Sequence, residues 1–225
     1  ITEDQVLDHY SREEVISYGK QVAWNQLWRN FCVSDTFEPG SPSKILTVAA
    51  GLEEGILKGN EYFDCGGYLH VGDWDIKCTA YRRGGHGSLS LTESIMQSCN
   101  VAMMRIGAMM GRDIFTKYQT IFGMGQKTGV DLPGEADAAG LVYSADKMGP
   151  TELATNAFGQ NYNCTMIQMA AALCSVINGG SYYEPHVVRQ ILNEQGSVVE
   201  RKDPVLVRET VSPVPYTHLR AHETG

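Results

Sequence analysis

The stretch from residue 37 to residue 60 begins Phe37-Glu-Pro-Gly-Ser-Pro-Ser-Lys44 and ends Lys58-Gly-Asn60, with an apolar run in between. Pro39 and Gly40 predict a turn, and Pro42 suits the first position of a helix because its φ is already fixed near the helical value. Apolar residues then recur at helical spacing, at Ile45, Val48, Ala49, Leu52 and Ile56. We therefore expect a helix that is buried on most sides and ends at Gly59.

Ser41 stands at the amino end of this predicted helix, where backbone N–H groups favour a developing negative charge. Lys44 follows one turn later on the same face. An amine held there accepts a hydroxyl proton when burial keeps it neutral, so the pair has the residue types of an activated serine. The alternative is a serine N-cap with a lysine that extends into solvent. Ser17 and Ser144 also begin a Ser-x-x-Lys pattern, so the spacing alone does not decide.

The composition narrows the class of protein. The 225 residues suffice for one domain with a hydrophobic core, or for part of a larger domain. The chain carries 18 basic and 26 acidic residues, a net charge of −8, and its densest basic spot is Arg82-Arg83. Nucleic-acid binding calls for clustered basic residues, so this charge argues against it.

No apolar run in the sequence is long enough to span a bilayer. The longest candidate, residues 166–177, is short and contains Gln168. The first residue is not methionine and no signal peptide is visible, so targeting signals do not give the location of the protein.

Six cysteines allow more than one reading. Cys65 and Cys78 flank a segment rich in glycine and aromatic residues and can approach each other across a hairpin, as a disulfide or as two free thiols. His70 and His86 lie nearby, but the spacing fits no zinc pattern, so a metal site ranks third and we assign no metal and no cofactor. The other four are expected to be small core residues: Cys32, Cys99, Cys164 and Cys174.

Sequence patterns place most of the remaining elements. Residues 1–30 have a helical pattern, and residues 60–87 predict short strands and turns. Two capping boxes, one at Ser90-Leu-Thr-Glu93 and one at Thr165-Met-Ile-Gln168, each predict the start of a helix. Further predicted elements are helices over 101–110, 113–122 and 150–156, and a hairpin formed by 186–192 and 197–202.

A second serine motif accompanies the first. Ser98-x-Asn100 is the only Ser-x-Asn in the sequence and follows Ser41 by 57 residues, at a predicted junction between helices. Other distinctive words surround the two motifs: Arg29-Asn30, Thr47, Ala49-Ala-Gly-Leu-Glu53, His86-Gly87, Gln97-Ser-Cys-Asn-Val-Ala102, Phe122-Gly-Met-Gly-Gln-Lys-Thr-Gly-Val-Asp-Leu-Pro-Gly-Glu135, Phe158-Gly-Gln160, Thr165-x-x-Gln168 and Asn178-Gly-Gly180. Together these residues, over about 25–210, resemble the transpeptidase domain of class B penicillin-binding proteins of the Gram-positive, clostridium-like type.

The resemblance implies an α+β fold of the penicillin-binding protein and β-lactamase type. It implies a peptidoglycan D,D-transpeptidase, in which Ser41 is acylated by the D-Ala-D-Ala end of a stem peptide or by a β-lactam. Lys44 would accept the proton of Ser41, Ser98 would pass a proton to the leaving D-alanine, and Asn100 would bind the substrate amide. One departure is Ser43, where the family usually has a large residue.

A third family motif, Lys-Thr-Gly on a strand after the Asn178-Gly-Gly180 turn, does not occur there. Lys127-Thr-Gly129 comes too early, in a loop, and we expect it to be structural. We therefore expect a partial domain over 1–213 that holds mainly the helical part and a β-hairpin, with the central sheet largely missing. We also expect this fragment to be inactive. The residues at 214–225 match nothing in the family and are predicted to be a non-native tail.

Two further expectations follow from the missing sheet. No complete five-stranded sheet should be present. The helix that carries Ser41 should also lose the cover of several apolar residues, among them Leu46, Val48, Ala49, Ala50 and Leu57.

The resemblance also implies partners and a location. The expected partners are peptidoglycan stem peptides, β-lactams and proteins of cell-wall synthesis and division, with no nucleic acid. The expected location is the outer face of the cell membrane, with anchoring by an amino-terminal transmembrane helix that this chain lacks. Alternatives on the same fold are a D,D-carboxypeptidase or β-lactamase, which use water as acceptor, and a β-lactam sensor, which needs only acylation.

Overall fold

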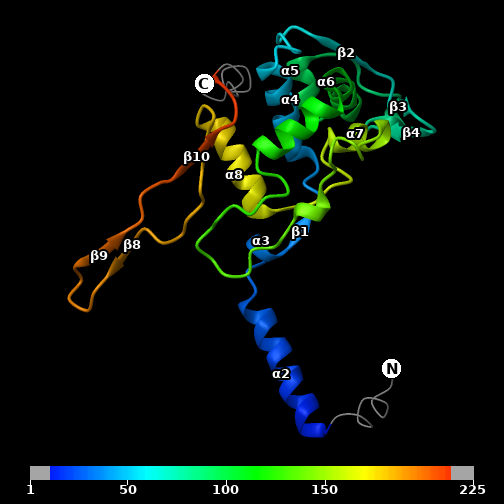
Figure 1. The fold of residues 1–225 in the computed structure, drawn as a ribbon. Helices are drawn as coiled ribbons and strands as arrows, with labels where there is room; N and C mark the ends of the chain where they lie inside the picture. Colours follow the sequence, from blue (N-terminus) through cyan, green and yellow to red (C-terminus); the bar gives the residue numbers. More distant parts are fainter. Residues whose placement is uncertain (1–10, 214–225) are drawn as a thin grey trace.

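The computed structural model describes residues 11–213. The predicted tail at 214–225 and the first ten residues lie outside the described residues. Figure 1 shows a mainly helical body, from which the long helix α2 (Arg12–Trp28) and the hairpin of β8 (Gln190–Leu192) and β9 (Val198–Arg201) extend in different directions. None of the helices in the described part of the chain is both long and apolar enough to cross a membrane.

The helices of the body run in chain order, with η marking 3-10 turns. They are α3 (Phe31–Ser34), η1 (Ser41–Ser43), α4 (Lys44–Glu53), η2 (Tyr81–Arg83), α5 (Leu91–Met96), α6 (Asn100–Ile121), η3 (Ala139–Leu141), α7 (Pro150–Asn156) and α8 (Met166–Ile177). Both predicted capping boxes are present, at the start of α5 and of α8. The break predicted at Gly111 is also present, since this residue has φ 72° and ψ 165° inside α6.

The helix that carries the first motif differs from its prediction at both ends. Ser41 begins a 3-10 turn, and the α-helix proper starts at Lys44. The helix ends at Glu53, not at Gly59, because Gly55 adopts a left-handed φ of 65° and donates its N–H to the Leu52 carbonyl at 3.0 Å. Such a residue ends a helix by satisfying a free carbonyl at low steric cost.

The expectation that α4 loses its cover is wrong. Val48 and Ala49 are 0 % exposed, and the other residues named for that loss, Leu46, Ala50 and Leu57, are also buried. The helices α6 and α8 pack against α4 within this chain and take the place that we had given to the missing sheet. The helix with Ser41 is therefore supported by a core that residues 11–213 supply themselves.

The strands form only two-stranded antiparallel sheets in the described residues, which confirms that no five-stranded sheet is present. Two pairs lie close in sequence around residues 60–90: β2 (Tyr62–Cys65) with β5 (Gly87–Ser90), and β3 (Tyr68–Val71) with β4 (Trp74–Lys77). The predicted hairpin is the pair β8–β9. Two pairs that we did not predict join distant segments: β1 (Thr36–Phe37) with β6 (Cys164–Thr165), and β7 (Ser181–Tyr183) with β10 (Leu206–Glu209).

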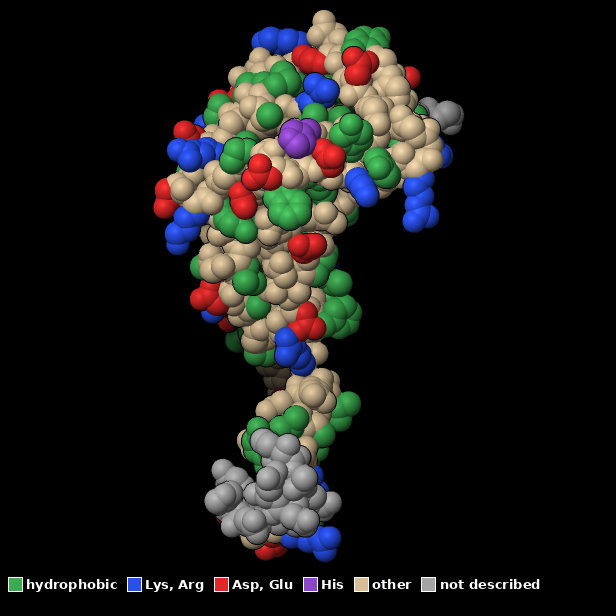
Figure 2. Space-filling view, turned by 90° about the vertical axis from the view of Figure 1, so that its right-hand side faces the viewer, with side chains coloured by type: hydrophobic (Ala, Val, Ile, Leu, Met, Phe, Trp, Pro, Cys, Tyr) green, Lys and Arg blue, Asp and Glu red, His purple; other side chains and the backbone are tan. Residues whose placement is uncertain are grey.

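The exposed apolar surface lies mainly outside the body. No residue of α2 is buried, and every residue of β8 and β9 is exposed. On the face shown in Figure 2, lysine and arginine side chains are interspersed with aspartate and glutamate, and no basic patch gathers there. This pattern agrees with the absence of a basic cluster in the sequence.

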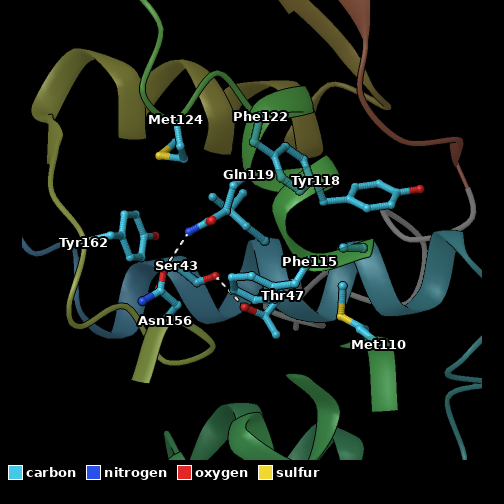
Figure 3. Close-up of a pocket in the computed structure, with 12 residues that line it drawn as sticks. Ser43, Thr47, Met110, Phe115, Tyr118, Gln119, Phe122, Met124, Asn156 and Tyr162 are labelled. Atoms are coloured by element: carbon cyan, nitrogen blue, oxygen red, sulfur yellow. Dashed lines mark hydrogen bonds between the residues drawn. The ribbon is translucent and has the colours of Figure 1, made fainter. Parts of the chain in front are cut away.

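Figure 3 shows the core behind α4, where Thr47 faces aromatic and methionine side chains of α6 and the loop that follows it. Gln119 donates a hydrogen bond to the Asn156 side chain at 3.1 Å, which ties α6 to α7. The cavity at this place has a volume of about 20 Å³, far below the roughly 300–1,000 Å³ of small-molecule sites. It is a packing gap in the core and not a place for substrate.

Candidate active site

All four of the predicted site residues meet in one hydrogen-bonded group. Ser41 Oγ lies 2.9 Å from Ser98 Oγ, and Lys44 Nζ lies 2.8 Å from the same Ser98 Oγ. Lys44 Nζ also contacts the Ser98 carbonyl oxygen at 2.8 Å and Asn100 Oδ1 at 2.7 Å. The structure therefore brings together Ser41, Lys44, Ser98 and Asn100, and it connects Ser41 to Lys44 through Ser98.

The hydrogen-bond partners of Lys44 determine whether its amine can accept a proton from Ser98. Two of its contacts, the Ser98 carbonyl and Asn100 Oδ1, can only accept a hydrogen bond. A neutral amine has two N–H groups for these two acceptors, which leaves its lone pair facing the Ser98 hydroxyl. In that state the Ser98 hydroxyl can donate to Lys44 and accept from Ser41. A continuous path for one proton then runs from Ser41 to Lys44.

Burial favours the neutral state of Lys44. The residue is only 3 % exposed, whereas Ser41 is open to solvent. Burial lowers the pKa of the Lys44 amine, and the nearby thiols of Cys78 and Cys99 act in the opposite direction. An exposed hydroxyl that is linked through Ser98 to a buried amine with a lowered pKa fits a nucleophile with its base.

The turn that carries Ser41 is held by a segment more than a hundred residues later. Gly40 donates its N–H to the Gly159 carbonyl at 2.7 Å. A Cβ on Gly159 would lie 2.0 Å from the Gly40 carbonyl oxygen and 2.3 Å from Ser43 Oγ, so only glycine fits. Ser43, the departure from the family pattern, is buried in this contact and bonds the Gly40 carbonyl at 2.8 Å. The segment Phe158-Gly-Gln160 therefore holds the turn that carries Ser41, through the contacts of Gly159 with Gly40 and Ser43.

The second motif occupies the turn between α5 and α6. Ser98 has a left-handed φ of 51°, which is uncommon for a residue with a side chain. Cys99 is the N-cap of α6, with its sulfur 3.5 Å from the Ala102 N–H, and Asn100 is the first residue of that helix. The side chains of Ser98 and Asn100 contact Lys44, while Cys99 between them is fully buried on another side.

The early Lys127-Thr-Gly129 lies in a loop with a structural role. Glu135 accepts hydrogen bonds from the Thr128 N–H and the Thr128 hydroxyl, both at 2.6 Å. Asp131 accepts from the N–H groups of Val187 and Val188 at 2.8 and 3.0 Å and so ties this loop to the segment before β8. Within the described residues, none of these groups bonds to Ser41, Lys44 or Ser98.

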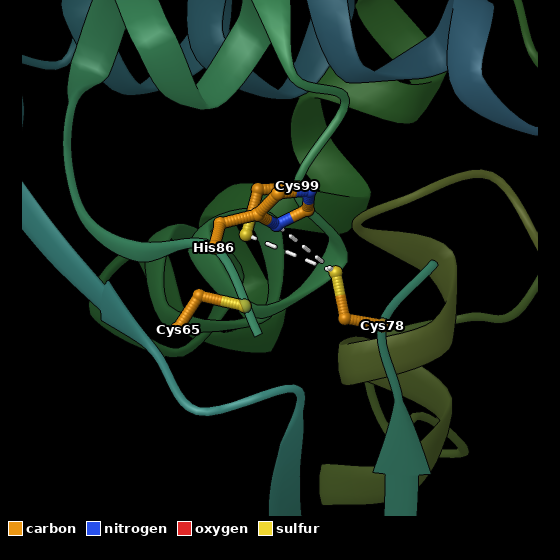
Figure 4. Close-up of side chains that lie close together, drawn as sticks. All are labelled: Cys65, Cys78, His86 and Cys99. Carbon is orange, nitrogen blue, oxygen red and sulfur yellow. Dashed lines mark hydrogen bonds between the residues drawn. The ribbon is translucent and has the colours of Figure 1, made fainter. Parts of the chain in front are cut away.

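A second cluster of reactive side chains lies beside the site, and sequence reasoning missed one of its members. The ligand atoms of Cys65, Cys78, His86 and Cys99 all lie within 4.8 Å of one another (Figure 4). Cys99 was predicted to be a plain core residue. It is buried as predicted, but its thiol faces the other three groups. Cys99 lies inside the Ser-x-Asn motif, which could have drawn attention to it. The sequence spacings typical of zinc sites do not include it, so it was missed.

The sequence of this chain matches a known protein family and several characterised relatives. Residues 3–221 match the family model described as penicillin binding protein transpeptidase domain. Stage V sporulation protein D of Bacillus subtilis is 37% identical over 187 residues, which cover 82% of this chain and 28% of that protein. Peptidoglycan D,D-transpeptidase MrdA of Acinetobacter baumannii is 31% identical over 169 residues, 71% of this chain and 25% of that protein. The chain thus spans between a quarter and a third of the length of these relatives.

Solved structures give the same picture. Penicillin binding protein 3 of Mycobacterium tuberculosis, crystallised in complex with aztreonam, superposes with a TM-score of 0.72 at 27% sequence identity. The superposition covers 84% of this chain and 41% of that one. Penicillin Binding Protein 2X of Streptococcus thermophilus has a TM-score of 0.75 at 24% identity, which supports the fold alone.

Proposed function

We propose, since this chain belongs to the penicillin-binding protein transpeptidase domain family, that it catalyses peptidoglycan D,D-transpeptidation through an acyl-enzyme on Ser41. The single observation that carries this proposal is the hydrogen-bonded path from Ser41 through Ser98 to the buried amine of Lys44. The names of the relatives support the reaction class, because MrdA is a peptidoglycan D,D-transpeptidase. The complex of a related protein with aztreonam supports β-lactams as ligands of this site.

In the proposed acylation, Ser41 Oγ attacks the carbonyl carbon of the penultimate D-alanine of a stem peptide. As the new C–O bond forms, the Ser41 proton moves to Ser98 Oγ and the Ser98 proton moves to the Lys44 amine. The C–N bond then breaks. Lys44 returns its proton to Ser98, and Ser98 passes its own proton to the nitrogen of the departing D-alanine, so Lys44 ends neutral again.

In the second step, the amine of a neighbouring stem peptide attacks the ester on Ser41. Ser98 and Lys44 take a proton from this amine, and Ser41 recovers its proton as the C–O bond breaks. The product is a peptide cross-link. Asn100 would bind the substrate amide, since its side chain already lies against Lys44 at the same end of the site.

The part of the family's site that lies on the later Lys-Thr-Gly strand has no counterpart among residues 11–213. In acyl-transfer enzymes generally, the loss of one oxyanion donor costs about 10²–10³ in rate. We therefore propose that the 225-residue chain on its own acylates slowly or not at all. We also propose that it works as part of a longer protein on the outer face of the cell membrane, with a membrane anchor upstream and division or wall-synthesis proteins as partners.

The test is covalent labelling with a fluorescent penicillin, in the 225-residue chain and in the longer protein that contains it. The longer protein should label at Ser41, as read by peptide mass spectrometry, and Ser41→Ala should abolish the label. Ser144→Ala changes one of the two other Ser-x-x-Lys serines and should leave labelling unchanged. Labelling that survives Ser41→Ala would contradict the proposal, and stoichiometric labelling of the 225-residue chain would contradict its predicted inactivity.

The same assay separates the proposed acceptor from water. A transpeptidase stays acylated by a β-lactam, whereas a β-lactamase turns it over. Rapid loss of the label with appearance of hydrolysed penicillin would therefore favour hydrolysis over transpeptidation. Ser98→Gly tests the relay, because glycine accepts the left-handed backbone of Ser98 without strain. This variant should lose acylation rate while keeping its fold.

A further inference from the structure

The cluster beside the active site is built from four segments that meet at one point. Cys65 is the last residue of β2, Cys78 follows β4 directly, His86 precedes β5, and Cys99 caps α6. Figure 4 shows the three thiols and the imidazole of His86 turned toward a common centre. All three cysteines are buried and His86 is half-buried. Three thiols and one imidazole, all of them common metal ligands, thus come together from four separate segments.

Two distances within the cluster are close to those of a tetrahedral metal site. Around a zinc ion with Zn–S of about 2.3 Å and Zn–N of about 2.0–2.1 Å, two sulfurs lie about 3.8 Å apart and a sulfur and a nitrogen about 3.6 Å. Cys78 Sγ lies 4.0 Å from Cys99 Sγ and 3.6 Å from His86 Nδ1. A disulfide requires about 2.05 Å between sulfurs, and all six cysteines are free thiols in this structure.

The surrounding backbone is shaped for this cluster. Gly85, next to His86, has φ 102°, and a Cβ there would lie 2.0 Å from the Cys65 carbonyl oxygen. The Cys78 N–H donates to the Gly67 carbonyl at 2.8 Å and closes the loop that contains β3 and β4. These close approaches bring the Cys65, Cys78 and His86 segments within reach of one another.

The segment from β2 to β5 also lacks a substantial core of its own. In β3 and β4 every residue is exposed or half-buried, and the buried apolar side chains between residues 62 and 90 are few and mostly small: Phe63, Cys65, Cys78, Ala80 and Leu89. Small, loop-rich units of this kind are stabilised in proteins by disulfides or by a structural metal. Three cysteines with one histidine are one of the donor sets of closed, structural zinc sites.

We propose that Cys65, Cys78, His86 and Cys99 bind one structural zinc ion, which fixes the turn that presents Ser98 and Asn100 to Lys44. Thiolate donors select zinc over magnesium or calcium. Because protein side chains would fill all four coordination positions of the zinc ion, no position is left for substrate or water. The site therefore has a structural role, and Cys99 is a positioning residue that acts through its two neighbours.

The proposal differs from our reading of the sequence, which ranked a metal site third and assigned no metal here. His86, a loop histidine there, becomes a ligand, whereas His70 on the exposed hairpin bonds Asp75 at 2.8 Å and is outside the cluster. The inference concerns metal binding and does not depend on the proposed acyl transfer.

The direct test is the zinc content of the purified 225-residue chain after dialysis, measured by inductively coupled plasma mass spectrometry. We expect about one zinc per chain. Cys65→Ser, Cys78→Ser, His86→Ala and Cys99→Ser should each lose it. Matched controls outside the cluster, Cys174→Ser and His70→Ala, should keep it, and so should Ser41→Ala. Binding of zinc by the wild type with no loss in the cluster variants would overturn the proposal.

Two further measurements keep the test decisive if a variant fails to fold. Replacement of zinc by cobalt(II) in the wild type should give the visible absorption bands of tetrahedral, thiolate-bound cobalt. Zinc should also protect three of the six thiols from a thiol reagent, and a chelator should expose them. A wild-type chain that is folded, free of metal and unchanged in thermal midpoint by added zinc chloride would refute the site. A disulfide between two cluster cysteines, found by mass spectrometry of the native chain, would also refute it.

The acylation assay separates this proposal from the proposed function. Loss of labelling on Ser41→Ala with zinc retained tests the chemistry alone. Removal of zinc from the longer protein should slow labelling while Ser41 and Lys44 remain unaltered, and added zinc should restore the rate. Zinc that binds as proposed but whose removal leaves both the labelling rate and the thermal midpoint unchanged would overturn its positioning role.

Discussion

The two sides of the candidate site are held in place in different ways. Ser41 and Lys44 begin a helix whose residues are buried against α6 and α8 in the main core. Ser98 and Asn100 follow a segment of short strands that contributes Cys65, Cys78 and His86 to the cluster, and Cys99 between them is its fourth member. One side is therefore fixed by apolar packing, and the other depends on a few specific polar and thiol contacts. The two sides should respond to different perturbations.

The largest effect should come from the Lys44 amine, where the two sides meet. Lys44→Ala should lower the acylation rate of the longer protein by about 10²–10⁴, the usual contribution of a general base. Lys147→Ala, which changes the lysine of an exposed loop, should leave the rate unchanged. Stopped-flow acylation by a chromogenic cephalosporin measures both rates. A loss of less than tenfold for Lys44→Ala would exclude it as the base.

The pH dependence of that rate follows from the same residue. The base is the neutral amine, and burial lowers the Lys44 pKa from its usual value of 10.5. The acylation rate should therefore rise with pH and reach its plateau below pH 10.5. In Lys44→Ala this rise should disappear. A rate that stays flat over the same range in the wild type would mean that another group takes the proton.

The packed side should be sensitive to loss of apolar volume. Leu46→Ala removes a buried side chain of α4 and should lower the free energy of unfolding by about 2–5 kcal/mol. Met109→Ala changes a residue of α6 that is 50 % exposed and should cost far less. Urea unfolding of the 225-residue chain measures both. Equal effects would show that α4 isn't part of the stable core.

The thiol side should be sensitive to backbone fit. Gly85→Ala places a methyl group 2.0 Å from the Cys65 carbonyl oxygen, whereas Gly84→Ala meets nothing within 4 Å. Both positions have a positive φ, so the pair isolates the clash. We expect Gly85→Ala to cost about 1–3 kcal/mol more than Gly84→Ala, the usual cost of forcing extra atoms into a closely packed place. The thermal midpoint and the zinc content of the two variants should fall in the same order.

The smallest effect should come from the exposed tip of the same segment. His70 and Asp75 form an exposed pair at 2.8 Å between β3 and β4. Exposed pairs contribute about 0–1 kcal/mol, so His70→Ala should hardly change the free energy of unfolding. His86→Ala, 16 positions later in the same segment, should change it clearly. Similar effects of the two substitutions would remove the distinction between the cluster and the surface around it.

Sequence reasoning succeeded where the signal is local. The two capping boxes, the break at Gly111 and the short helix after Pro150 all depend on neighbouring residues, and all are present. The convergence of Ser41, Lys44 and Ser98 was predicted from the motif pair and is present in the structure. Their chemical roles stay predictions.

Sequence reasoning failed where the outcome depends on distant partners. The end of α4 was placed at Gly59 because Gly55, which ends the helix, was passed over. The cover of α4 was assigned to an absent sheet because no pattern shows that α6 and α8 fill that place. Cys99 was predicted to be a plain core residue for a similar reason. Only the folded chain brings its thiol close to Cys65, Cys78 and His86.

The bond from the Asn161 N–H to Glu38 has a consequence for the order of folding. It joins residues 123 positions apart, and Thr47 bonds the Ala157 carbonyl across 110 positions. The thiol contact of Cys78 with Cys99 spans only 21 positions. Closing a longer loop costs more chain entropy. During synthesis, therefore, we expect the cysteine cluster to assemble first, while the turn with Ser41 waits until residues near 160 have left the ribosome.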